Sequence, residues 1–149
     1  MSGAGASAID RLRFENIAIS VSDLDRAVAW YREVLGFRDV RSGEFANVGA
    51  RFAFLEGKGM SIELISTGKA QRPATLVEPP HHLASVGYKA IVLRTDDLAQ
   101  VTQELEHAGV PIVWKLQPLT DDIAATLIRD LDGNFINIFG LNHKGGASA

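Results

Sequence analysis

The chain has 149 residues, of which 46% are apolar and 22% charged, as expected for a folded globular protein of one domain. Its net charge of −3 is spread along the sequence, with no basic stripe and no apolar run near the ~20 residues of a membrane helix, so we expect neither nucleic acid nor a membrane as a partner. Cysteine is absent from the chain, which excludes disulfides, thiol chemistry and cysteine-bound zinc.

The first half of the chain shows a strand, a helix and then three further strands. In "FENIAISV" apolar residues alternate with small or polar ones, which is the pattern of a half-buried strand. Asp23 can cap the helix that follows, and Gly36 can end it. We predict strands at residues 14–21, 38–42, 51–56 and 60–66.

The second half repeats this order after a connector, residues 67–87, that contains three prolines. "YKAIVLRTDDL" (88–98) aligns with "FENIAISVSDL" (14–24) at an offset of 74 residues, and "GNFINIF" (133–139) aligns with "GMSIELI" (59–65) at the same offset. Strands are predicted at residues 88–95, 112–115, 125–130 and 134–140. The Asp-Gly pair in "DLDGNF" predicts a hairpin turn with positive φ angles. A connector of this length usually carries function or covers a site.

The repeat predicts an α+β fold of two βαβββ modules, at residues 13–67 and 87–141. We expect one domain over 13–142, with flexible tails at 1–12 and 143–149. Each sheet should bury one face under its helix and leave the other face free. The free faces mix aromatic, small and polar groups, which suits a ligand cavity; they comprise Phe14, Asn16, Ala18, Ser20, Ser61, Glu63 and Ile65 in the first module and Tyr88, Ala90, Val92, Arg94, Phe135, Asn137 and Phe139 in the second.

The opening stretch, with "VSDLDRAVAWYREVLGF", and the closing "RDLDGNFINIF" resemble the vicinal oxygen chelate superfamily, which includes glyoxalase I, extradiol dioxygenases and bleomycin resistance proteins. The resemblance covers about residues 14–141. It implies that the two module sheets form a cupped, partly open barrel with the helices outside. It also implies a homodimer.

The same resemblance implies a divalent metal held by the first and last strand of each module. The four ligand positions correspond to Asn16, Glu63, Ala90 and Asn137, and only Glu63 keeps a residue of the family's usual kind. Alanine cannot bind a metal, and neutral amide oxygens are weak ligands beside imidazole or carboxylate. We therefore expect no metal and no other cofactor, although Glu63 with a connector histidine stays open as a weaker metal site.

The polar candidates each have a functional and a structural interpretation. A carboxylate between apolar neighbours in a strand needs a reason, so Glu63 is the predicted catalytic residue, or else an ion-paired structural remnant. Asn16 and Asn137 would contact the ligand, or hydrogen-bond to one another. Arg94 would bind an anionic group, pair with Glu63, or lie in solvent at the rim.

The aromatic and histidine candidates are also open to two interpretations. Tyr88, Phe14, Phe135 and Phe139 either line a ligand or belong to the core. His81 and His82 follow "EPP" in the connector, where at most one could face a site and transfer a proton. The alternative is that both are surface residues.

Two functions fit these residues. The first is a metal-free enzyme that moves a proton through Glu63 in an isomerisation, lyase-type elimination or cyclisation of a small oxygen-rich organic molecule. The second is a protein that binds and sequesters a drug or metabolite, similar to bleomycin resistance proteins. Because the start of the chain lacks a signal peptide pattern and cysteine is absent, we expect a cytoplasmic location.

Overall fold

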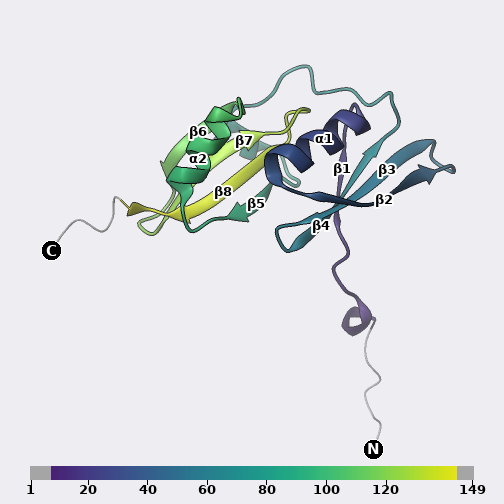
Figure 1. Ribbon diagram of the computed structural model, residues 1–149, viewed down its shortest axis with the longest axis horizontal. Helices are drawn as coiled ribbons and strands as arrows, with labels where there is room; N and C mark the ends of the chain where they lie inside the picture. Colours follow the sequence, from purple (N-terminus) through teal and green to yellow (C-terminus); the bar gives the residue numbers. More distant parts are fainter. Residues whose placement is uncertain (1–7, 144–149) are drawn as a thin grey trace, which may run out of the picture.

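The computed structural model describes residues 8–143 and contains two four-stranded sheets, each with one long helix (Figure 1). A short 3-10 helix, η1 (Ile9–Arg11), precedes β1 (Ile17–Ser20), α1 (Leu24–Leu35), β2 (Arg38–Phe45), β3 (Ala50–Gly57) and β4 (Met60–Ser66). A second short 3-10 helix, η2 (His81–Ala84), precedes β5 (Ala90–Arg94), α2 (Leu98–His107), β6 (Ile112–Pro118), β7 (Ile123–Arg129) and β8 (Phe135–Leu141). The predicted order of strand, helix and three strands therefore occurs twice.

The two sheets have the same topology. Their strand orders are β1-β4-β3-β2 and β5-β8-β7-β6, with the first and last strand of each module in parallel and the other pairs antiparallel. The register repeats as well, because Ile17 pairs with Ile62 and Ile91 pairs with Ile136. The predicted α+β fold of two βαβββ modules is confirmed. Over residues 8–143 the sheets lie beside each other and do not close into a barrel (Figure 1).

Both long helices begin at an aspartate. The carboxylate of Asp23 accepts a hydrogen bond from the backbone N–H of Arg26 at 3.1 Å, and Asp97 accepts one from Gln100 at 3.0 Å. Such caps satisfy N–H groups that have no partner inside the first helical turn. α1 ends at Gly36, whose φ of 72° is left-handed and therefore suits a residue without a Cβ atom. The predicted start and end of α1 are confirmed.

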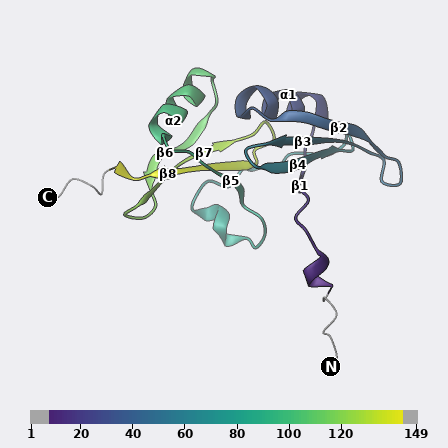
Figure 2. The same cartoon turned by 60° about the horizontal axis from the view of Figure 1, so that its bottom comes forward.

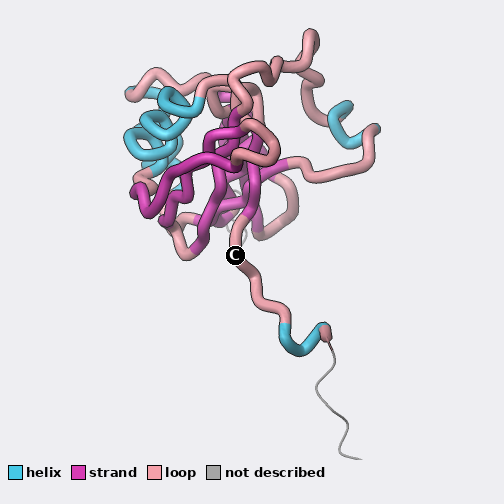
Figure 3. Tube along the Cα trace, turned by 90° about the vertical axis from the view of Figure 1, so that its right-hand side faces the viewer, coloured by secondary structure: helices cyan, strands magenta, loops and turns pink. Residues whose placement is uncertain are grey.

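The hydrophobic core lies between the helices and one face of each sheet. Leu55, Ile62 and Leu64 in the first sheet and Ile128 and Ile136 in the second are fully buried there. Neighbouring residues along a strand point to opposite faces, so each sheet has a second, open face. Figures 2 and 3 show the connector and η2 on the side of the sheets away from α1 and α2.

The modules are joined by hydrogen bonds between the start of the first module and the β7–β8 turn. The hydroxyl of Tyr31 on α1 donates to Asp130 at 2.9 Å in a buried contact. Ser22 donates to Asp132 from its backbone N–H at 3.0 Å and from its hydroxyl at 2.5 Å. Arg72 of the connector also donates to Asp132, at 3.1 Å. We call these contacts the module junction, because they connect segments of the two modules that are distant in sequence.

The strands differ from their predicted limits mainly at the sheet edges and ends. β1 and β5 begin later than predicted, so Phe14 and Tyr88 lie before the strands and are 72% and 107% exposed. β2 and β6 extend further than predicted, to Phe45 and Pro118, because pairing with the neighbouring strand continues past the apolar pattern.

The turn and the tails also depart from expectation. Between residues 130 and 135 only Gly133 has a positive φ, 89°, and the carboxylate of Asp130 instead accepts the N–H groups of Asp132 and Asn134. In the predicted first tail, residues 9–11 are helical, while residues 1–7 and 144–149 lie outside the described part of the chain. No helix within residues 8–143 has the length and apolar character needed to cross a bilayer.

Candidate functional site

The open face of the first sheet carries Glu63 on one of its two central strands. Strand pairing places Ala18, Glu63, Phe54 and Arg41 side by side across β1, β4, β3 and β2. Directly paired residues project from the same face of a sheet. The sequence neighbours of Glu63 are buried on the helix side, so the carboxylate belongs to the open face. It is half-buried there, between a methyl group and a phenyl ring.

The second sheet has the corresponding row. Val92, Asn137, Leu127 and Trp114 lie side by side across β5, β8, β7 and β6. Asn137 therefore holds in the second sheet the position that Glu63 holds in the first, in agreement with the offset in the sequence. The two candidate residues lie in different sheets of the same chain.

The predicted polar residues do not pair with one another. Asn16 lies just before β1 and is half-buried, whereas Arg94 is exposed at the end of β5. Over the described residues the side chains of Glu63, Asn16 and Arg94 form no hydrogen bond or ion pair, and the Oδ1 atom of Asn137 is also unpaired. The structure thus contains neither a Glu63–Arg94 pair nor an Asn16–Asn137 hydrogen bond within residues 8–143.

The predicted aromatic residues separate into two groups. Phe135 and Phe139 are half-buried on the open face of β8. Phe14 and Tyr88 are highly exposed and precede the strands on which they were expected. Only the first group contributes directly to an open sheet face in the described chain.

Sequence reasoning missed an aromatic surface beside Glu63. The rings of Phe45 and Phe52 stack with their centroids 4.3 Å apart, and Phe52 is 5.0 Å from Phe54, the direct neighbour of Glu63. The alternation in "RFAFLE" could have placed Phe52 and Phe54 on this face. Phe45 lies on this face because it pairs with Ala50 beside the β2–β3 turn, and Trp114 lies between two register shifts in β6; the sequence pattern reveals neither arrangement.

The connector covers part of the second sheet's open face. His82 is half-buried with its ring edge-on to Phe135, at a centroid distance of 5.0 Å, while its neighbour His81 is exposed. The guanidinium group of Arg129 lies 4.1 Å from the centroid of the same Phe135 ring and donates to Glu78 at 2.9 Å. Of the two connector histidines, only His82 therefore contacts a predicted site residue.

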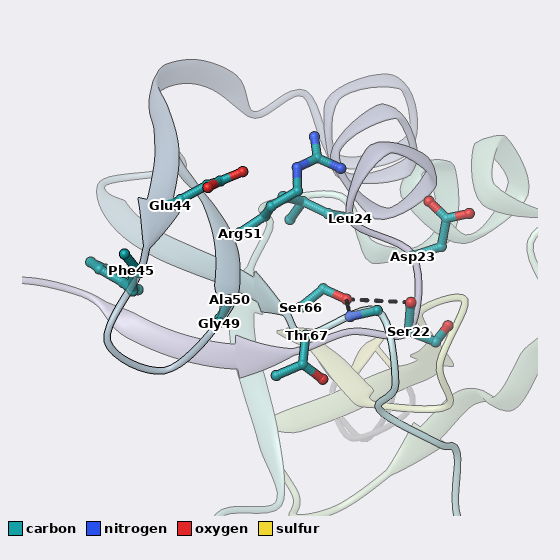
Figure 4. A pocket seen from close by; sticks show the side chains of 12 residues that line it. Ser22, Asp23, Leu24, Glu44, Phe45, Gly49, Ala50, Arg51, Ser66 and Thr67 are labelled. Atoms are coloured by element: carbon teal, nitrogen blue, oxygen red, sulfur yellow. Dashed lines mark hydrogen bonds between the residues drawn. The ribbon is translucent and has the colours of Figure 1, made fainter.

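A separate cavity of about 540 Å³ lies at the end of the first sheet, between the start of α1, the β2–β3 turn and the end of β4 (Figure 4). Its volume is in the range of ligand pockets. However, its main polar groups already have partners: Arg51 donates to Asp25 at 2.9 Å, and the Ser66 hydroxyl donates to the backbone oxygen of Ser22. The hydrogen bond and charge of Arg51 hold the pKa of Asp25 below its ordinary value. Because Glu63 does not line this cavity, we base the candidate site on the open sheet faces.

The residues at the four positions that the resemblance would assign to metal ligands are a poor set for a divalent metal. Asn16, Glu63, Ala90 and Asn137 provide one carboxylate, two amides and a methyl group. Zinc, iron and nickel sites in proteins require imidazole, thiolate or several carboxylates. Across residues 8–143 no three His, Asp or Glu side chains gather in an arrangement that could hold a metal ion.

The comparison with protein families identifies the class of this protein. The chain matches the Glyoxalase/Bleomycin resistance protein/Dioxygenase superfamily over residues 13–138. The chain therefore belongs to this superfamily, and the resemblance found in the sequence is confirmed. A search of the curated proteins gives no significant match.

Solved structures share the fold at low sequence identity. A trypanothione-dependent glyoxalase I from Leishmania major is 23% identical, with a TM-score of 0.65 over 89% of this chain and 88% of that chain. A glyoxalase family protein from Bacillus cereus is 21% identical, with a TM-score of 0.68 over 91% of this chain and 99% of that one. TioX from Micromonospora sp. ML1 is 24% identical, with a TM-score of 0.62 over 87% of this chain and 98% of that chain. At these identities the similarity establishes the fold alone.

Proposed function

We propose that this protein is a metal-independent enzyme that moves a proton on a small oxygen-rich organic molecule, with Glu63 as the acid–base group. The observation that carries this proposal is the half-buried Glu63 carboxylate, which has no hydrogen-bond or ion-pair partner among the described residues. A carboxylate kept in such a place without a partner costs stability, so a function is the natural reason for its presence. Isomerisations, eliminations and cyclisations that transfer a proton can use such a group.

The other site residues would bind and orient the substrate. Asn16 precedes by two residues Ala18, which is paired with Glu63, and would hydrogen-bond a substrate oxygen. Asn137 and Arg94 lie on the second sheet, where an amide and a guanidinium group suit a carbonyl or a developing negative charge. Phe54 would limit the access of water to one side of the Glu63 carboxylate.

We also propose that residues 13–142 form a single domain and that the protein is a homodimer. In this dimer a second copy of the chain would cover the open sheet faces. An apolar side chain on these faces remains exposed in one chain: Val92, which is paired with Asn137, is 53% exposed. Burying it on association would be favourable. Light scattering at micromolar concentration should give twice the chain mass, and a purely monomeric mass would refute the dimer.

Proton transfer can be tested without knowing the natural substrate. We would incubate the protein in D2O with a panel of hydroxyketones and keto acids and follow deuterium uptake next to the carbonyl group by NMR. For a compound that exchanges, Glu63→Gln should lower the rate about 100- to 10,000-fold, because it removes the proton-accepting oxygen and keeps the shape. Binding should change by less than about tenfold.

The matched control is Glu56→Gln. Glu56 lies on the neighbouring strand β3, but its carboxylate is exposed and paired with Arg38 at 2.6 Å. Exposed pairs contribute little to stability, so this variant should keep the wild-type rate. Equal rates for the wild type and Glu63→Gln, with loss instead in a His81 or His82 variant, would assign the chemistry to the connector.

A second candidate function, sequestration without turnover, is favoured by the aromatic surface. Phe52 is buried, and the half-buried rings of Phe45 and Phe54 beside it would offer a surface on which a planar ligand could stack. In that case Phe54→Ala would weaken ligand binding, while Glu63→Gln would alter affinity only and no compound in the panel would exchange deuterium.

A further inference from the structure

Two buried side-chain atoms within the described residues have no hydrogen-bond partner: Nδ1 of His82 and Oδ1 of Asn137. They come from different parts of the chain, the connector and β8. Buried polar atoms in proteins are nearly always paired, and an unpaired one destabilises the folded state. Two such atoms therefore require an explanation, and their positions supply one.

The two side chains have a common neighbour, Phe135. The His82 ring contacts Phe135 edge-on at 5.0 Å. Asn137 follows Phe135 by two residues on the same face of β8, which corresponds to a separation of about 7 Å along the strand. A small molecule on this face could reach both side chains.

The segment that carries His82 is attached to the sheet by a small number of contacts. We call residues 76–84 the strap. Arg129 donates to the backbone oxygen of Val77 at 3.4 Å and to Glu78, whose side chain is 64% exposed. Leu76 packs closely on Gly133, where an added Cβ atom would lie 2.7 Å from the leucine Cδ2. Because the Glu78 end of the ion pair is exposed and the apolar contact is small, we infer that the strap can separate from the sheet at modest cost.

We propose that the strap covers a binding site for an aromatic molecule that carries a hydroxyl group. A hydroxyl can donate to Oδ1 of Asn137 and at the same time accept from Nδ1–H of His82, so one group satisfies both unpaired atoms. The aromatic ring of the ligand would pack against Phe135. Neither atom is accessible to solvent in the closed arrangement, so the strap lifts to admit the ligand and closes over it.

The chemistry of the site selects this class over others. A carboxylate would place negative charge against the Asn137 oxygen, and a cation would lie close to the guanidinium group of Arg129. An amide would have to reach the two atoms with two separate groups, its N–H and its carbonyl oxygen, whereas a hydroxyl meets both through one oxygen atom. The site goes beyond the proposed proton transfer but shares Asn137 with it; because Glu63 lies in the other sheet, failure of one proposal can be told apart from failure of the other.

Phenol and toluene provide a direct test, since they differ by a hydroxyl in place of a methyl group. In NMR titrations of the full chain, phenol should shift the His82 ring nitrogens and the Asn137 side-chain amide. It should also bind at least tenfold more tightly than toluene, because a site built to bond a hydroxyl rejects the analogue without one. Asn137→Leu and His82→Phe should each abolish this preference and leave toluene binding unchanged.

Two control variants separate the possible causes of failure. His81→Phe changes the exposed neighbour of His82 and should retain the preference for phenol. Glu63→Gln should also retain it, so loss of proton transfer and loss of phenol binding would be distinguishable. If Asn137→Leu does not fold, His82→Phe still decides the question, because His82 lies on the connector and outside both sheets.

The proposal would be overturned by equal affinities for phenol and toluene, or by phenol shifts that leave His82 and Asn137 unchanged. It would also be overturned by a crystal structure in which one water molecule bridges the two atoms and remains there in the presence of phenol.

Discussion

The buried hydroxyl of Tyr31 should make a measurable contribution to the stability of the module junction. Tyr31 is 1% exposed, and its hydroxyl donates to the Asp130 carboxylate at 2.9 Å. Burial raises the pKa of Tyr31, and the charge of Asp130 raises it further, so the hydroxyl keeps its proton at all ordinary pH values. The Tyr31→Phe variant removes this donor and leaves the ring in place.

Hydrogen bonds to charged groups contribute about 1.5–3 kcal/mol. Asp130 keeps three other donors, namely the backbone N–H groups of Asp132 and Asn134 and the side-chain amide of Asn134, so its charge is not left without partners. We therefore expect a loss of about 2 kcal/mol in the free energy of unfolding. For a chain of this size that corresponds to a fall in Tm of roughly 4–8 °C.

Urea denaturation followed by circular dichroism would measure this loss as a lower midpoint at unchanged slope. Tyr88→Phe is the matched control, because Tyr88 is fully exposed and its hydroxyl should contribute less than about 0.5 kcal/mol. If Tyr31→Phe unfolds at the same urea concentration as the wild type, the hydroxyl does not stabilise the junction and the reasoning is wrong.

Three further predictions concern the junction, the helix packing and metal content. Burial by itself raises the pKa of Asp132, but hydrogen bonds from Ser22 and Arg72 outweigh burial and hold that pKa below its ordinary value. The stability that Asp132 contributes should therefore be present above about pH 4 and be lost as pH falls through its lowered native-state pKa. In urea unfolding, the Asp132→Asn variant should be less stable than the wild type at pH 7. This difference in stability should shrink at about pH 3. The Gly140→Ala variant should be about 1–3 kcal/mol less stable, because the added Cβ atom would lie 2.6 Å from the Cβ atom of Leu98 on α2. The loss would be measured as a lower Tm, and an unchanged Tm would contradict this packing. Elemental analysis of the purified protein should find no stoichiometric zinc, iron, manganese or nickel, and about one such metal per chain would contradict our interpretation of the ligand positions.

Local patterns in the sequence were sufficient to predict the modules. The offset between "FENIAISVSDL" and "YKAIVLRTDDL" predicted two copies of one topology, and both copies are present. Asp23 and Gly36 predicted the limits of α1, because capping depends on residues within one helical turn. Alternation also predicted that Glu63 and Asn137 occupy the open faces, since side chains in a strand alternate strictly.

The sequence by itself determined the repeat, the helix limits and the face on which each strand residue lies, because all of these follow from short-range periodicity and capping. Only the tertiary structure decided which residues of different elements contact one another. The stacked rings of Phe45 and Phe52 depend on the register of β2 against β3. The contacts of Tyr31 with Asp130 and of His82 with Phe135 join residues far apart in the chain. Such contacts form only when the modules pack together and the connector folds onto the second sheet. The free energy of that packing cannot be read from any local sequence pattern.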